Sequence, residues 1–189
     1  MPEDFLMGAF AQPAEEAAFA FRACLEAMAR PGRVQTISGA IPPAPLSVAS
    51  GTLLLTLANA STPIYLAPSH DTAAIRDWIA FHCGAPIVPA ERATFALGTW
   101  EALHPVSRFD IGTSDYPDRS ATLIVEMDAL SEPNARLTGP GIETLHEARL
   151  PEIAAFRENR ARFPLGFDCI FTSDTSVSAL PRSTYVTAL

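Results

Sequence analysis

The side chains best suited to chemistry in this sequence are arginines. All thirteen basic residues of the 189-residue chain are arginine, and no lysine is present. A guanidinium keeps its charge and offers planar, bidentate hydrogen bonds to carboxylates and phosphates. Without lysine the chain has no Walker lysine, no Schiff-base lysine and no lysine general base. The chemistry that remains open to it is the recognition of anions by arginine.

Several of these arginines stand in turns, close in the sequence to acidic residues. The turn arginines are Arg30, Arg119, Arg136 and Arg182, and the nearby acids are Asp115, Asp118, Glu132 and Asp168. Ion pairs that hold loops are one interpretation. Such pairs contribute about 0–1 kcal/mol when exposed, and breaking one costs about 3–5 kcal/mol when it is buried. The other interpretation is a site for an anion or for a partner protein.

Glycine and proline mark tight turns near the same arginines. Gly139-Pro140-Gly141 must turn, because proline fixes φ at about −65° and the flanking glycines tolerate positive φ. Such a turn lets the backbone approach a ligand or another segment closely, and it is also a common way to leave a strand. The candidate residues for binding a ligand or a partner are Arg30, Gly32, Arg119, Gly139, Gly141, Asp168 and Arg182.

Common catalytic and metal-binding motifs are missing from the sequence. There is no G-x-S-x-G nucleophile elbow, no H-E-x-x-H and no C-x-x-C. Thr144 stands where a dinucleotide-binding fingerprint that starts at Gly139 needs a third glycine or an alanine. We therefore assign no catalytic residue and no metal ligand from the sequence.

Apolar residues recur at helical spacing in four segments bounded by caps, prolines or glycines. The predicted helices run over 13–28 and 47–60, from the Asp71-Thr72 cap to Gly84, and from Pro151 to Pro164. In the first of them, Phe21, Cys24, Leu25 and Met28 share one apolar face. The predicted strands are 34–37, 64–66, 94–97, 109–111, 121–127 and 167–171.

This order of elements favours a single α/β domain over residues 1–189. Strands alternate with helices in the first half and a helix returns near the end, as in a three-layer α/β/α sandwich with helices on both faces of a sheet. The strands between 94 and 138 have no helix between them. We therefore expect hairpins there, and hence a mixed sheet.

Composition excludes several classes of protein. A hydrophobic fraction of 48% indicates a filled core, and a net charge of −8 argues against nucleic acid or an anionic membrane as a partner. No apolar run reaches the ~18 residues of a membrane span, and the acidic N-terminus lacks the basic region of a secretory signal. Cys24, Cys83 and Cys169 are odd in number and scattered, as expected for reduced thiols in the cytoplasm.

A set of short motifs occurs in a specific order over nearly the whole chain. The clearest are Ala29-Arg30-Pro31-Gly32, LTGPGI at 137–142, FPLGFD at 163–168 and Leu180-Pro181-Arg182. This set resembles the H subunit of the bacterial carbon–phosphorus lyase system (the PhnH family). The resemblance implies a fold reminiscent of the large domain of pyridoxal-phosphate (PLP)-dependent transferases. Those enzymes hold PLP on a lysine, so we expect no covalent PLP and no other cofactor here.

The resemblance also implies a function and partners. It predicts an accessory, non-catalytic subunit of the carbon–phosphorus lyase core complex, which transfers alkylphosphonate onto the ribose of ATP with loss of adenine. The implied partners are a second copy of the chain, giving a homodimer, and the G, I and J subunits, with L and K binding transiently. The alternative is a stand-alone transferase or binding module that holds a nucleotide or phosphate ester in arginine clamps.

Overall fold

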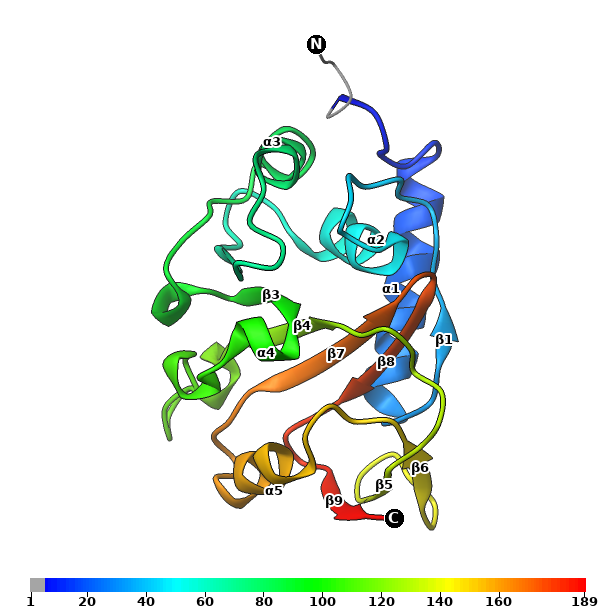
Figure 1. Ribbon diagram of the computed structural model, residues 1–189, viewed down its shortest axis with the longest axis vertical. Coiled ribbons are helices and arrows are strands. Elements are labelled where there is room, and N and C mark those ends of the chain that lie inside the picture. The colour runs from blue at the N-terminus through cyan, green and yellow to red at the C-terminus, as the bar shows by residue number, and fades with distance from the viewer. Residues whose placement is uncertain (1–5) are drawn as a thin grey trace.

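A six-stranded mixed sheet forms the centre of the protein in the computed structural model, which describes residues 6–189 (Figure 1). Four neighbouring strands are parallel: β2 (Ile64–Leu66), β3 (Phe95–Thr99), β4 (Thr122–Glu126) and β7 (Asp168–Ser173). Strand β8 (Ser176–Leu180) pairs antiparallel with β7 and with the short edge strand β1 (Gln35–Thr36). The order β1-β8-β7-β4-β3-β2 confirms the predicted mixed sheet.

Three helices cover one face of this sheet: α1 (Pro13–Ala29), α2 (Val48–Leu57) and α3 (Ala73–His82). Alternate residues of a strand point to opposite faces, and Ile124 of β4 packs on this side. Helix α2 is apolar or small on all sides, so its first two turns are buried. Thr72 caps α3 as predicted, because its side chain accepts the backbone N–H of Ile75. None of the helices in the described part of the chain is long and apolar enough to cross a membrane.

The opposite face is covered by helices and by a second, smaller sheet. The elements are α4 (Trp100–Leu103), α5 (Ile153–Ala161), β5 (Ala135–Thr138), β6 (His146–Ala148) and β9 (Tyr185–Ala188). Strands β6, β5 and β9 form an antiparallel sheet in that order. Leu123 and Val125 of β4 point to this side, where Phe156 of α5 and Leu137 of β5 complete the second half of the core. The three-layer α/β/α arrangement is confirmed, and the small sheet is an addition that the sequence did not reveal.

Two local predictions are wrong. Residues 109–111 are not a strand, because Phe109 follows a 3₁₀ turn and packs edge-on against Tyr65, with 5.7 Å between ring centroids. The strands between 94 and 138 do not form hairpins with one another either: β3 and β4 are parallel, and the segment between them contains the short helix α4. Strand β5 belongs to the second sheet. The sheet is mixed for a different reason, namely the β7–β8 hairpin that turns at Asp174, where φ is 51°.

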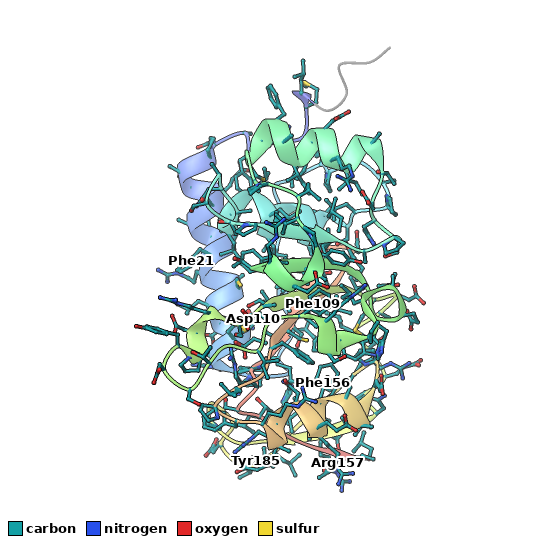
Figure 2. All side chains as sticks on the ribbon, turned by 90° about the vertical axis from the view of Figure 1, so that its left-hand side faces the viewer. Phe21, Phe109, Asp110, Phe156, Arg157 and Tyr185 are labelled. Carbon is teal, nitrogen blue, oxygen red and sulfur yellow. The ribbon has the colours of Figure 1, made fainter. Side chains whose placement is uncertain are left out.

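Helix α1 buries small residues and leaves an apolar stripe exposed. Its buried residues are Ala20, Cys24 and Ala27, whose small side chains allow close packing against α2 and β8. Of the predicted apolar face, Cys24 is buried and Met28 packs against the core, but Phe21 and Leu25 are 52% and 56% exposed. Figure 2 shows Phe21 pointing outward from the helix. Because residues four apart are neighbours on a helix, Phe21 and Leu25 form a continuous apolar stripe on the outside of the molecule.

Candidate interaction site

The two glycine turns that the sequence singles out pack against each other. Gly141 has φ +81°, and a Cβ added there would lie 2.0 Å from the carbonyl oxygen of Ala29 at the end of α1. Gly32 has φ +83°, and its added Cβ would lie 2.7 Å from the side chains of Leu137 and His146. The Gly32 N–H also donates to the carbonyl of Ala179 at 3.1 Å. The close backbone approach at these glycines is therefore to another segment of the same chain.

Gly139 extends this contact to the C-terminal segment. It has φ +127°, and its added Cβ would lie 3.4 Å from the carbonyl oxygen of Ser183. The turn at 139–141 thus lies between the end of α1 and the segment that follows Leu180-Pro181-Arg182. Motifs that are far apart in the sequence therefore form one continuous structural unit.

Arg182 and Asp168 form the polar centre of this unit. The Arg182 Nε donates to Asp168 Oδ1 at 3.1 Å, and Nη2 donates to Oδ2 of the same carboxylate. The Arg182 backbone N–H donates to Oδ1 as well, at 2.8 Å. Nη1 donates to the Pro117 carbonyl at 2.8 Å, and Nη2 also donates to the Ser120 hydroxyl. All three guanidinium nitrogens therefore bind protein atoms, and the side chain joins β7 to the 117–120 segment and to the chain after β8.

The remaining turn arginines are exposed. Arg30 forms an ion pair with Glu26, with 2.9 Å between Nε and Oε1, and its side chain is 51% exposed. Arg119 stacks on the ring of Tyr116, with 3.9 Å from the guanidinium carbon to the ring centroid. Arg136 lies 3.7 Å from Glu147 in the neighbouring strand. Arg30 and Arg119 therefore present cationic groups at the surface.

The Arg182–Asp168 pair lies at the amino end of the parallel strands, since Asp168 is the first residue of β7. In open α/β sheets, small ligands bind outside the carboxyl ends of the strands instead.

At the carboxyl edge of the sheet, Glu126 ends β4 and accepts hydrogen bonds from the Ser47 backbone N–H at 2.8 Å and from the Thr172 hydroxyl at 3.2 Å. The Glu126 carboxylate thereby connects β4 and β7 to the start of α2.

Buried His70 lies beside the same carboxylate. Its Nε2 is 4.0 Å from Glu126 Oε1, and its Nδ1 shares a hydrogen bond of 2.9 Å with the Ser69 hydroxyl. Burial lowers the pKa of His70, against the opposing effects of Glu126 and the Pro45 carbonyl. This network of His70, Ser69 and Glu126 was not predicted from the sequence. The available signal was that Ser69 and His70 come three and four residues after the predicted strand at 64–66, and that Glu126 stands near the end of the predicted strand at 121–127.

A cleft of about 390 Å³ opens beside Glu126 at the same edge. Its charged lining residues are Glu101, Glu126, Asp128, Glu132 and Arg149, so carboxylates outnumber guanidinium groups by four to one. Such a lining repels phosphate and phosphonate groups. Within residues 6–189, no three histidine, cysteine, aspartate or glutamate side chains are placed to hold a metal ion together.

Comparison with known proteins identifies the family. Residues 8–187 match the family model for the bacterial phosphonate metabolism protein (PhnH). The chain is 40% identical over 186 residues to the alpha-D-ribose 1-methylphosphonate 5-triphosphate synthase subunit PhnH of Rhizobium meliloti (strain 1021), covering 94% of this chain and 93% of the relative. It is 30% identical over 176 residues to a putative C-P lyase subunit protein, HtxG, of Stutzerimonas stutzeri, covering 88% of this chain and 84% of the relative. These matches confirm the resemblance seen in the sequence, and the chain belongs to the PhnH family of bacterial phosphonate metabolism proteins.

Proposed function

We propose that this chain is an accessory subunit of a carbon–phosphorus lyase complex. In this role it supports the transfer of alkylphosphonate onto the ribose of ATP with loss of adenine, and it contributes no complete active site of its own. Both relatives are named as subunits, and the match to the Rhizobium protein extends over almost the full length of both chains. A protein of this kind acts through the surfaces that it presents to partners.

The observation that carries this proposal is the hydrogen bonding of Arg182. The rival function, a transferase or binding module with arginine clamps, needs a guanidinium that is free to bind a phosphate. Arg182 instead binds Asp168, Pro117 and Ser120 with all three of its guanidinium nitrogens. The cleft at the carboxyl edge, lined mainly by carboxylates, is also a poor site for an anionic substrate.

We assign the candidate residues two roles within this proposal. Arg30 and Arg119 are exposed and are proposed to contact a partner protein, because arginine is favoured at interface anchor points. Gly32, Gly139, Gly141, Asp168 and Arg182 are proposed to hold the turns that support this surface. The proposed partners are the G, I and J subunits, with L and K binding transiently, and the proposed location is the cytoplasm.

A homodimer through α1 is part of the same proposal. The stripe formed by Phe21 and Leu25 is apolar, and Arg22 and Glu26 follow it along one side of the helix. If two copies of α1 cross antiparallel about a two-fold axis, Phe21 of each copy meets Leu25 of the other. Arg22 then lies close to Glu26 of the second copy. The stripe is thus complementary to itself in both shape and charge, as an isologous interface requires.

No covalent PLP is expected in this subunit, despite the fold class. The aldimine of PLP-dependent enzymes forms on a lysine amine, which this sequence lacks. Treatment with PLP and borohydride, followed by mass spectrometry, should yield no adduct apart from one at the N-terminal amine. An adduct at any internal residue contradicts this expectation.

Calorimetry separates the accessory role from its rival. The isolated protein is titrated with ATP and, separately, with methylphosphonate. An accessory subunit shows no saturable binding of either. An arginine-clamp enzyme binds ATP, and Arg182→Ala abolishes that binding in a variant that thermal melts show to be folded. Saturable binding that depends on Arg182 replaces the proposal with the rival function.

A further inference from the structure

We propose that the surface at the end of α5 is a docking site for an acidic segment of a partner protein. The arginine–aromatic surface consists of Arg157, Arg160, Phe163 and Tyr185. This inference rests on the proposed role as a subunit and adds the face and the chemistry of one contact. This surface is separate from the proposed homodimer stripe, and Tyr185 borders the turn at Gly139.

Arg160 is held between two aromatic rings. Its guanidinium carbon lies 4.1 Å from the centroid of the Tyr185 ring and 4.8 Å from that of Phe163. One terminal nitrogen, Nη2, donates to the Tyr185 hydroxyl at 2.6 Å. These ring contacts and the hydrogen bond restrict the guanidinium before any partner arrives. An arginine fixed in this way loses less conformational entropy when it binds a carboxylate.

Arg160 forms no ion pair with the residues that the structure describes. Its Nε is buried and has no hydrogen-bond partner among residues 6–189. Its Nη2 donates to a neutral phenol, the Tyr185 hydroxyl. Arg182 differs, because Asp168 binds its guanidinium at two points. Two aromatic rings and a hydroxyl therefore hold the Arg160 side chain in place, but no carboxylate among the described residues pairs with its charge.

Arg157 places a second unpaired cation one turn earlier on α5. It is exposed, and it forms no ion pair within the described residues. Figure 2 places Arg157 and Tyr185 together at the lower end of the molecule, and Figure 1 shows α5 beside β9 there. In a chain of net charge −8, these two arginines outnumber Glu158, the carboxylate that lines the hollow beside Arg157, and make a local positive surface. Such a surface complements an acidic partner.

The exposed aromatic rings extend the contact beyond a simple charge patch. Phe163 is 50% exposed and Tyr185 is 53% exposed. Arginine, tyrosine and other aromatic residues are the types that most often anchor protein interfaces. Interaction with the negative end of the α5 dipole accounts for one cation in the last turn. The helix dipole does not explain why the rings of Phe163 and Tyr185, which contact Arg160, are half exposed.

The shape of the surface favours a protein over a small anion. Small-molecule sites are concave and bury most of their ligand. The hollow beside Arg157 is open, and its lining consists of Ala154, Arg157, Glu158 and Ala161. A phosphate bound there leaves the rings of Phe163 and Tyr185 uncovered. An acidic segment with apolar neighbours covers the rings and the arginines together.

The test is a quantitative pull-down of tagged full-length variants with the co-expressed G, I and J subunits, at low and high salt. The variants are Arg157→Glu, which reverses an exposed charge, and Tyr185→Phe, which keeps the ring but removes the hydroxyl that holds Arg160. Arg92→Glu is the matched control, because Arg92 is also exposed and has no ion pair within the described residues. Thermal melts verify that each variant is folded.

We expect Arg157→Glu to weaken association about tenfold or more at low salt, and high salt to reduce that difference. Tyr185→Phe should lie between Arg157→Glu and the wild type, and Arg92→Glu should match the wild type. If the wild type associates and Arg157→Glu associates equally well, the docking site is overturned while the subunit role stands. If the wild type itself does not associate, the subunit role fails and this inference fails with it. If Arg157→Glu instead loses binding of added inorganic phosphate while it still assembles, the surface is a small-anion site and the docking proposal is wrong.

Discussion

Arg182 and Asp168 form an ion pair with two hydrogen bonds at the amino edge of the central sheet. The distance from Nε to Oδ1 is 3.1 Å, and the two side chains are only 13% and 18% exposed. The same guanidinium reaches Pro117 and Ser120. One arginine thus fixes the positions of three segments that the chain brings together from distant parts of the sequence.

Removing this ion pair should destabilise the fold. We expect Asp168→Ala to lower the free energy of unfolding by about 3–5 kcal/mol, because it leaves a mostly buried guanidinium without its counter-charge. Arg30→Ala breaks an exposed pair with Glu26 and should cost about 0–1 kcal/mol. Urea denaturation of both variants provides the comparison. Equal losses contradict a structural role for Arg182 and Asp168.

Gly141 should tolerate a side chain less well than Gly84 does. Both have positive φ, +81° and +63°, so alanine is strained at either position. At Gly141 an added Cβ also collides with the Ala29 carbonyl at 2.0 Å, whereas at Gly84 the nearest atom is 3.9 Å away. We expect Gly84→Ala to cost about 1 kcal/mol and Gly141→Ala to cost clearly more, as measured by urea denaturation. Similar costs at the two sites contradict the packing of the 139–141 turn against α1.

His70 should make folding stability depend on pH. Burial lowers its pKa in the folded protein below the ordinary value of 6.5, so the unfolded chain takes up the proton first as the pH falls. The wild type should therefore lose stability as the pH falls below 6.5, and His70 should have no such effect above it. His70→Asn should show a flatter profile than the wild type. Chemical denaturation between about pH 5 and pH 8 measures this, and identical profiles for His70→Asn and the wild type contradict the prediction.

The α1 stripe should govern self-association. Leu25→Asp places a charge in the proposed two-fold contact and should convert the homodimer to a monomer. Phe19→Asp is the matched control, because Phe19 is 72% exposed but lies on another side of the same helix. Light scattering at several protein concentrations measures the molar mass of the wild type and of each variant. A wild-type monomer at all concentrations contradicts the homodimer, and a Leu25→Asp dimer contradicts the choice of face.

Local sequence patterns were enough to predict the central layers. Buried parallel strands appear as short apolar runs, and the segments at 64–66, 121–127 and 167–171 overlap β2, β4 and β7. Helix caps and stops such as Thr72 and Gly84 act through neighbouring residues, so the sequence reveals them directly. These parts of the fold depend on interactions that are short in sequence.

The parts that were missed depend on distant contacts. Strands β6 and β9 have only three and four residues, and both pair with β5 in the second sheet. On α1, periodicity grouped Phe21 and Leu25 with Cys24 on one apolar face, whereas the structure buries Ala20, Cys24 and Ala27. Close packing against α2 and β8 selected the small residues. In the candidate site, the sequence named Arg182 and Asp168 separately, and only the fold joins them to Pro117 and Ser120.

The most direct test of the account is the identification of what co-purifies with a tagged copy of this chain from its own phosphate-starved cells. Mass spectrometry of the purified material, with a parallel measurement of ATP binding, gives the result. The accessory role predicts that the G, I and J subunits are recovered in constant ratio with the tagged chain, and that the isolated chain does not bind ATP. Recovery of the tagged chain without other subunits, together with saturable ATP binding, contradicts it.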